Sequence, residues 1–396
     1  MNDKYFCASP FVRVTLNPNG DVSTCCYYPK FKKSYETLSD IFYGDEMIEL
    51  RQRMLNGEKL KGCQICYDHD SAGKKSIRQA MNSIHQEIDE INNPRLQELE
   101  FASSTKCNFK CITCNSNFSS AWKEEISSSL NLRKQYGFSE HINHQTSSNY
   151  FPNENDIKNL IGIIITGGEP TLEKKFDKAF FEMLEKNVDM NNFVLSLVTN
   201  NSKFINSHWK NFVKKLRRAR VNISLDGVKD VGEFVRFGMK WKIFCNNLEK
   251  WKNVFKDKES VNIDDEGVYK SGLSFNFVTT CFNLLNLPDT IKFLQSHNLL
   301  DVLVLHNCFI PEYLNPQYLP DSTKNLILEN LKNYNVDLMG CGSAKSTDFV
   351  ENILYGDNFN SEHCKKMINY ANYLEKIFGK IPDQSLRVLN DIKTHV

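Results

Sequence analysis

The chain has 396 residues, 41% of them hydrophobic and 24% charged, which is enough for two or three domains with a substantial core. Its 49 basic and 48 acidic residues give a formal net charge of +1, which excludes the strongly basic surface of a dedicated nucleic-acid-binding protein. The longest apolar run, at residues 160–165, is too short to cross a membrane, and the first residues lack the basic and apolar segments of a secretory signal. We therefore expect a cytoplasmic protein with reduced cysteines.

Residues 1–92 are predicted to form an N-terminal domain. Residues 11–25 alternate in polarity around a turn at residues 17–20, which predicts a β-hairpin. Residues 45–56 have the amphipathic pattern of a helix and are followed by glycine. A polar stretch ending at Pro94 predicts the linker to the next domain.

Strands and helices alternate over residues 93–310, and this order indicates an α/β fold with parallel strands in a barrel or an open sheet. Two long polar interruptions, residues 127–155 and 256–271, are interpreted as surface insertions. Residues 311–396 are predicted to be a mainly helical extension. The predicted strands are Leu96–Phe101, Ile161–Thr166, Phe193–Thr199, Val221–Leu225, Leu273–Thr279 and Val302–His306, and the clearest helices between them are Lys175–Lys186 and Trp209–Arg218.

Thirteen cysteines in a reducing compartment indicate metal or redox chemistry rather than a disulfide scaffold. Cys107, Cys111 and Cys114 have the spacing C-x3-C-x2-C on a loop that follows a predicted strand. Three thiolates on one loop could hold three irons of a cubane cluster and leave the fourth iron open to a substrate or cofactor. Five other cysteines are scattered singly and are expected mainly to pack as small apolar residues: Cys245, Cys281, Cys308, Cys341 and Cys364.

Polar residues follow three of the predicted strands. Gly167–Glu169 in the motif TGGEP combine glycines, which allow close approach of a ligand, with a carboxylate that suits an ammonium group; the alternative is a tight strand-to-helix turn. Ser224 and Asp226 at the end of another strand suit a ribose diol, or they form an ordinary Asp-Gly turn. Asn200 at the end of a third strand is either a cap or a ligand contact.

The cysteine loop, followed about 50 residues later by GGEP, resembles the radical S-adenosylmethionine (radical SAM) superfamily. The resemblance implies a partial (β/α)6 TIM-type barrel with a [4Fe–4S] cluster at the C-terminal mouth of its strands. It implies that SAM binds the open iron through its amino and carboxylate groups. One electron, from a reducing partner such as flavodoxin or ferredoxin, would then cleave SAM to a 5′-deoxyadenosyl radical that abstracts a substrate hydrogen. By resemblance, Gly167, Gly168 and Glu169 hold the SAM amino group, Ser224 and Asp226 hold its ribose, Arg236 contacts its carboxylate, and Asn200 is a further contact.

One residue departs from the family pattern, because Thr113 stands where an aromatic residue usually precedes the third cysteine. This leaves the adenine contact at that position open.

The N-terminal cysteines Cys7, Cys25, Cys63 and Cys66 resemble the twitch/SPASM-type auxiliary-cluster module. Four cysteines would saturate a second [4Fe–4S] cluster, which suits electron transfer, whereas the alternative is a structural zinc site. Cys26 is adjacent to Cys25 and could replace it as a ligand.

Three functions are compatible with these features. The auxiliary module favours modification of a peptide or protein by cross-linking, epimerisation or oxidation. The alternatives are the tailoring of a small molecule, such as a sugar, nucleotide or amino-acid derivative, and a non-enzymatic iron–sulfur redox protein, against which the SAM-binding residues count. Cys281 and Cys308 both follow predicted strands, so each is a candidate hydrogen-atom donor or a packing residue.

Overall fold

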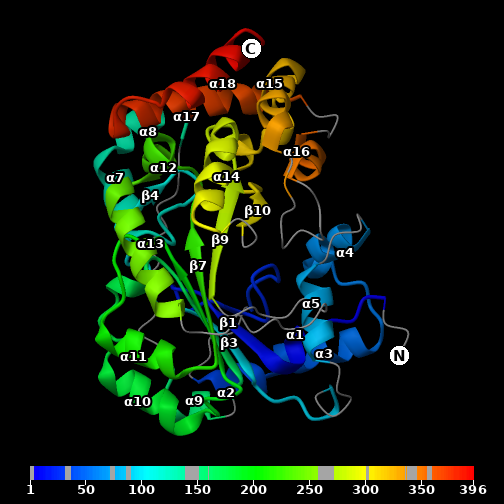
Figure 1. Cartoon of the computed structure of the whole chain (residues 1–396). Coiled ribbons are helices and arrows are strands. Elements are labelled where there is room, and N and C mark those ends of the chain that lie inside the picture. Colours follow the sequence, from blue (N-terminus) through cyan, green and yellow to red (C-terminus); the bar gives the residue numbers. More distant parts are fainter. Residues whose placement is uncertain are drawn as a thin grey trace.

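The centre of the molecule is a sheet that contains eight strands within the described residues, in the order β10-β9-β7-β6-β5-β3-β1-β2 (Figure 1). Residues 139–150 and 257–271, which belong to the predicted insertions, lie outside the described part of the chain, as does Cys341. The computed structural model describes residues 4–31, 37–71, 76–85, 91–138, 151–158, 160–256, 272–299, 303–334, 336, 346–354 and 359–396.

Six neighbouring strands of the sheet are parallel and follow one another in chain order, which is the arrangement of a partial (β/α)6 barrel. The predicted α/β fold is therefore confirmed. Each predicted strand is present within three residues of its expected start. The strands are β3 (Glu98–Ala102), β5 (Gly162–Thr166), β6 (Val194–Thr199), β7 (Arg218–Ser224), β9 (Gly272–Thr279) and β10 (Leu303–Asn307).

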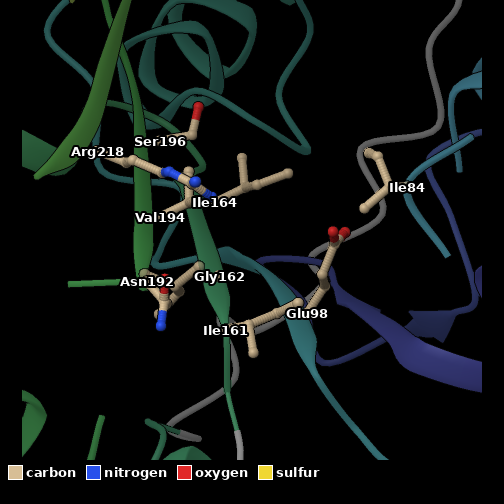
Figure 2. A pocket seen from close by; sticks show the side chains of 10 residues that line it. Ile84, Glu98, Ile161, Gly162, Ile164, Asn192, Val194, Ser196 and Arg218 are labelled. Carbon is tan, nitrogen blue, oxygen red and sulfur yellow. The ribbon is translucent and has the colours of Figure 1, made fainter. Parts of the chain in front are cut away.

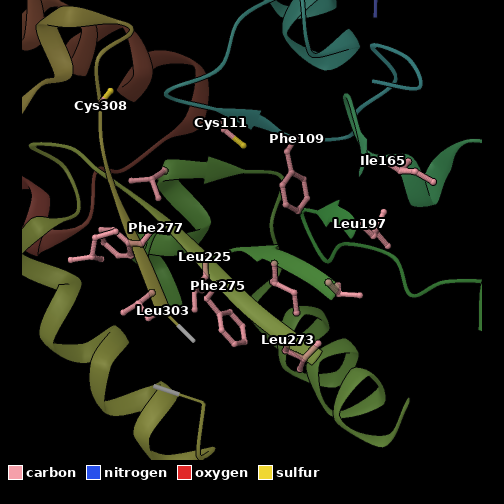
Figure 3. Packing of buried hydrophobic residues seen from close by; sticks show 14 of the residues in the cluster. Phe109, Cys111, Ile165, Leu197, Leu225, Leu273, Phe275, Phe277, Leu303 and Cys308 are labelled. Atoms are coloured by element: carbon pink, nitrogen blue, oxygen red, sulfur yellow. The ribbon is translucent and has the colours of Figure 1, made fainter. Parts of the chain in front are cut away.

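One face of these strands is apolar and packs against helices. Leu195 and Leu197 of β6 are fully buried on this face, and Phe181 and Trp209 of two covering helices meet edge to face with ring centroids 5.0 Å apart. Figure 3 shows the corresponding apolar side chains of β9 and β10, among them Phe275. The covering helices include α10 (Lys178–Asn187), α11 (Ser207–Lys215), α13 (Trp241–Phe255) and α14 (Leu287–Ser296).

The end of α11 differs from the prediction. The helix was expected to run to Arg218, but it ends at Lys215, and Leu216 already has extended backbone angles. Asn206 caps the start of this helix by accepting hydrogen bonds from the backbone N–H groups of His208 and Trp209. Arg218 therefore begins β7 rather than ending α11.

The opposite, concave face of the sheet carries polar side chains that bond to one another. Asn222 of β7 donates to the Ser196 hydroxyl of β6 at 2.9 Å, and the Arg220 Nε donates to Ser274 of β9 at 3.2 Å. Alternate residues of a strand point to opposite faces, so the same strands supply both the apolar and the polar layer.

The predicted N-terminal hairpin is part of the same sheet. Its first strand, β1 (Arg13–Leu16), pairs in parallel with β3, and β2 (Val22–Ser23) pairs antiparallel with β1. Residues 11 and 12 were expected in the strand but belong to the helical turn α1 (Ser9–Val12), which has a proline in its first turn. The proposed domain boundary at residues 92 and 93 thus separates units that share one sheet. The N-terminal helices are α2 (Leu38–Phe42), α3 (Asp45–Leu55), α4 (Gln64–Ser71) and α5 (Ile77–Ile84), with a 3-10 turn, η1 (Lys61–Cys63).

The C-terminal part is mainly helical, as predicted, and its longest helix packs onto the barrel. The Phe378 ring stacks on Phe237 with centroids 3.9 Å apart, and it also contacts Trp122. No helix in the described residues is both long and apolar enough to cross a membrane. The C-terminal helices are α15 (Asp321–Leu331), α16 (Ser346–Leu354), α17 (Ser361–Phe378) and α18 (Asp383–Lys393).

Candidate active site

The cysteine loop follows β3 and is fixed by a short strand pair. Cys111 lies in β4 (Lys110–Cys111), which pairs antiparallel with β8 (Arg236–Phe237), so Cys111 is directly opposite Arg236. Cys111 is buried, whereas Cys107 and Cys114 are half-buried. Burial raises the pKa of Cys107 and raises that of Cys114 to about 11. Iron would therefore have to displace protons from all three thiols on binding.

The GGEP turn lies in direct backbone contact with the start of this loop. The Gly168 N–H donates to the Ser104 carbonyl at 2.7 Å, and the Glu169 N–H donates to the Lys106 carbonyl at 2.7 Å. A Cβ on Gly168 would overlap the Lys106 carbonyl oxygen, and Gly167 has φ +116°, which side chains rarely allow. The two glycines are thus required by the approach of the cysteine loop itself.

The Glu169 carboxylate is buried and bonded entirely within the protein. One oxygen accepts hydrogen bonds from the N–H and hydroxyl of Thr171 and from the Thr199 hydroxyl, at 3.1, 2.7 and 2.8 Å. The other oxygen accepts from the Asn200 N–H at 2.6 Å. Burial raises the pKa of Glu169 despite these donors. The carboxylate therefore ties the end of β5 to the end of β6, a role that the sequence motif did not reveal.

Asp226 and Arg236, which the resemblance assigned to different groups of SAM, are paired with each other. The Arg236 Nη1 donates to Asp226 Oδ2 at 2.6 Å, and Asp226 Oδ1 accepts from the Val278 N–H at 2.8 Å. The Arg236 Nε is buried and has no hydrogen-bond partner among the described residues. Burial lowers the pKa of Arg236, but the neighbouring Cys111 and Asp226 outweigh it and raise the value overall.

Asn200 and Ser224 complete the set at the strand ends. The Asn200 amide donates to Asn108 Oδ1 at 3.1 Å and lies 3.8 Å from the Cys107 sulfur, so it contacts the cysteine loop directly. Ser224 is the last residue of β7, half-buried on the concave face and opposite Asn276 of β9. The structure thus brings all the SAM-binding candidates to one end of the barrel, around the three cysteines.

These residues fit an iron–sulfur cluster with SAM. Cys107, Cys111 and Cys114 supply three thiolates, and the unbonded Nε of Arg236 is a donor available to a carboxylate next to Cys111. Sequence reasoning missed Thr171, Thr199 and Asn108, which hold these groups in place; a threonine at a strand end is too common to signal such a role.

The N-terminal cysteines lie before α1 (Cys7), after β2 (Cys25), in η1 (Cys63) and in α4 (Cys66). Burial raises the pKa of Cys7 most, and Cys25, Cys63 and Cys66 raise it further, so these four thiols act on one another. Backbone N–H groups at residues 27 and 28 lower the pKa of Cys25, which burial raises. Such donors are typical of a liganding sulfur.

Cys26 has a different environment from Cys25. Cys26 is exposed, whereas Cys25 is half-buried and its sulfur is near the backbone N–H groups of residues 27 and 28. Glu100 of β3 acts electrostatically on both cysteines. Cys25 is therefore the better candidate for the fourth ligand of the auxiliary site. Among the described residues, no three His, Cys, Asp or Glu side chains converge on the position of a single metal ion.

The candidate hydrogen donors Cys281 and Cys308 are both buried, each with 1% of its surface exposed, in the apolar core. The Cys308 sulfur lies 3.6 Å from the Ile310 carbonyl oxygen. Both positions agree with the packing alternative, and a donor role stays a hypothesis.

Two families match separate parts of the chain. The model of the radical SAM superfamily matches residues 102–264, which contain the cysteine loop, the GGEP turn and the Asp226–Arg236 pair. The model of SPASM, an iron–sulfur cluster-binding domain, matches residues 7–67 and includes all five cysteines of the N-terminal region. Among curated proteins, none matches the chain significantly.

Solved structures with a similar chain path have low overall similarity. One is anSMEcpe with bound AdoMet and a peptide, at 20% identity and a TM-score of 0.40; the match covers 60% of each chain. Another is SuiB of Streptococcus suis bound to S-adenosylmethionine, at 13% identity and a TM-score of 0.37, covering 87% of this chain and 72% of SuiB. The chain therefore spans about 60% of the length of the anSMEcpe protein that it matches.

A partial parallel barrel carries three cysteines at its C-terminal mouth, an arrangement that suits an iron–sulfur cluster. By the two family matches, residues 102–264 are a radical SAM domain and residues 7–67 are an SPASM-like auxiliary module. Its cofactors are SAM and [4Fe–4S] clusters. The enzyme hypothesis is thus confirmed over the non-enzymatic alternative, and the iron–sulfur module over the zinc site.

Proposed function

We propose that this enzyme modifies a residue of a peptide or protein by abstracting a hydrogen atom, with the auxiliary cluster transferring an electron. When bound, the cluster and SAM supply a one-electron cleavage that yields a carbon radical able to react with an unactivated C–H bond. The observation that carries the proposal is the contact of the cysteine loop with the GGEP turn and with the Asp226–Arg236 pair in one mouth.

The protein's own residues would hold and orient these groups. Cys107, Cys111 and Cys114 would bind three irons, and the buried guanidinium of Arg236 would orient the SAM carboxylate, held in place by Asp226. Arg236 can bind Asp226 and the SAM carboxylate at the same time because a guanidinium has five N–H donors. Ser224, the last residue of β7, would contact the ribose of SAM.

The concave face supports a substrate with many hydrogen-bonding groups. Asn222, Ser274 and Asn276 line it along β7 and β9, and the His306 ring of β10 bonds to Asn276 at 3.2 Å. A peptide backbone offers one donor and one acceptor per residue, so it would pair well with this surface. Cys25 rather than Cys26 would complete the auxiliary site with Cys7, Cys63 and Cys66.

The first experiment tests the chemistry. Anaerobic reconstitution followed by iron and sulfide counting should give about eight irons per chain. With dithionite, or with flavodoxin or ferredoxin as the proposed reducing partner, the loaded protein should form 5′-deoxyadenosine from SAM. A fully loaded protein that forms none contradicts the proposal.

A second experiment separates the peptide from the small-molecule substrate. The active enzyme is incubated with SAM and short peptides encoded beside its gene, and each product is analysed by mass spectrometry. A peptide that loses two mass units or gains a solvent deuterium supports modification of peptides. Turnover only of a sugar, nucleotide or amino-acid derivative would support the alternative.

A further inference from the structure

The concave face holds a cavity at the end of the barrel remote from the cysteine loop. Figure 2 shows it between the first residues of the strands and the end of α5. Its volume is about 90 Å³, room for a small polar group with its solvent. The residues that matter here are Ile84, Glu98, Ile164, Val194, Ser196 and Arg218, all of which line the cavity.

The acidic side chain of this cavity is already balanced. Glu98 lies 3.3 Å from the His85 ring nitrogen and 3.7 Å from the Arg13 guanidinium. Burial raises the pKa of Glu98, but His85 and Arg13 outweigh it and lower the value, so the carboxylate is ionised and paired. Arg13 in turn bonds to Glu100 at 2.5 Å.

Arg218 differs from these residues because its charge is not balanced. Among the described residues it has neither a hydrogen bond nor an ion pair, and its Nε is buried without an acceptor. The next arginine on the same face, Arg220, donates to Ser274 at 3.2 Å. A half-buried guanidinium with an orphaned N–H beside a cavity is a site for an external acceptor.

The distance between the Arg218 cavity and the GGEP turn sets the length of a ligand that reaches both. In β5, Gly162 lines the cavity and Thr166 precedes the GGEP turn, so the two ends are four residues apart. At about 3.3 Å per residue, the cavity lies about 13 Å down the strand from the turn. A molecule that reaches both ends must be extended, with the length of about four peptide residues.

We propose that Arg218 binds a carboxylate at the far end of the substrate and so sets which C–H bond lies at the barrel mouth. This assignment rests on the proposed function for the reaction at the other end. A carboxylate fits better than a phosphate because one guanidinium offers one bidentate fork, which matches the two oxygens of a carboxylate. The group would be the C-terminus or an acidic side chain of a peptide.

Binding is tested with two probes of nearly equal shape, acetate and acetamide, and with inorganic phosphate as a third. The probes are added to the reconstituted protein. Saturation-transfer NMR measures the affinities of acetate and acetamide from their methyl protons, and the affinity of phosphate is measured by its displacement of acetate. We expect acetate to bind at least tenfold more tightly than acetamide or phosphate. Equal binding of acetate and acetamide, absent acetate binding, or tighter binding of phosphate would each overturn the carboxylate assignment.

Three variants test whether acetate binds at Arg218. Arg218→Gln should weaken acetate binding at least tenfold, whereas Arg217→Gln, at the exposed neighbouring position, should leave it unchanged. Arg218→Lys should retain part of the affinity, because a lysine keeps the charge but loses the fork. A circular-dichroism melt and an iron count check that each variant folds. Because acetate binding needs no SAM cleavage, the result stands even if the proposed reaction fails.

Discussion

The Tyr370 hydroxyl of α17 donates a hydrogen bond of 3.1 Å to the backbone carbonyl of Ile112, which lies between the second and third cysteines of the loop. The two residues are 258 positions apart in the chain. Helix α17 thus holds the cysteine loop through this bond. Tyr370→Phe should cost about 1 kcal/mol of stability and should speed the loss of iron from the loop, measured with a chelator.

The matched control for this variant is Tyr373→Phe, on the same helix. It removes a hydrogen bond of 2.8 Å between the Tyr373 hydroxyl and the hydroxyl of Ser129, the residue before α8 (Leu130–Gln135), which is not part of the cysteine loop. It should therefore lower the melting temperature by a similar amount with iron release unchanged. Equal iron release in the two variants would show that α17 does not support the loop specifically.

The close approach at Gly168 predicts a strong effect of a single methyl group. Gly168→Ala would force the turn away from the Lys106 carbonyl, so the iron content should fall from about eight towards about four per chain as the loop is displaced. Gly162→Ala, at the start of the strand β5 that precedes this turn, is the control, because its Cβ would have its nearest neighbour at 3.6 Å. Full iron content in Gly168→Ala would show that the cysteine loop does not need the close approach of Gly168 to the Lys106 carbonyl.

The buried carboxylate of Glu169 predicts a loss of stability that is independent of SAM. In Glu169→Gln the amide NH2 would face either the Asn200 N–H or the threonine donors, at a cost of about 1–3 kcal/mol. Thr199→Val removes one of the same bonds and should lower the melting temperature less. Both are measured without SAM, and SAM affinity is then measured by calorimetry. Unchanged stability of Glu169→Gln would argue against the tie between β5 and β6.

Iron counting can show which of the adjacent residues Cys25 and Cys26 is a ligand of the auxiliary cluster. Cys25→Ala should lose the auxiliary cluster and retain about four irons, whereas Cys26→Ala should retain about eight. The reason is that Cys25 is half-buried and acts electrostatically on Cys7, Cys63 and Cys66, whereas Cys26 is exposed. The reverse result would assign Cys26 as the ligand.

Burial of the two candidate hydrogen donors predicts that they do not determine the product. Cys281→Ala and Cys308→Ala should leave solvent deuterium in the product unchanged, and each should cost about 1 kcal/mol or more of stability because a small apolar group is lost from the core. If deuterium incorporation falls in one variant, that thiol is a donor and the substrate reaches it.

The sequence predicted the strands and the ends where ligands gather, because apolar β-branched runs followed by polar turns have a distinct pattern. Ile163 and Ile165 of β5, followed by Gly167 and Gly168, are an example. The alternation cannot show which strands are neighbours, so the pairing of β1 with β3 was not predicted.

The hydrogen bonds between residues of the candidate site could not be predicted from the sequence either. Asp226 and Arg236 were both singled out, but as contacts to a cofactor rather than to each other. Tertiary contacts between residues with no periodic relation, such as Glu169 with Thr199, leave no local pattern. Arg218 was missed for a simpler reason, since it was placed at the end of a helix and not on the concave face.

The register between Arg13 and Glu98 joins the auxiliary hairpin to the barrel through a ladder of backbone hydrogen bonds. The two iron–sulfur sites are therefore parts of one rigid frame, and no hinge between these strands can vary the gap that an electron crosses. Electron transfer between them should proceed by tunnelling over a fixed distance and should be insensitive to solvent viscosity.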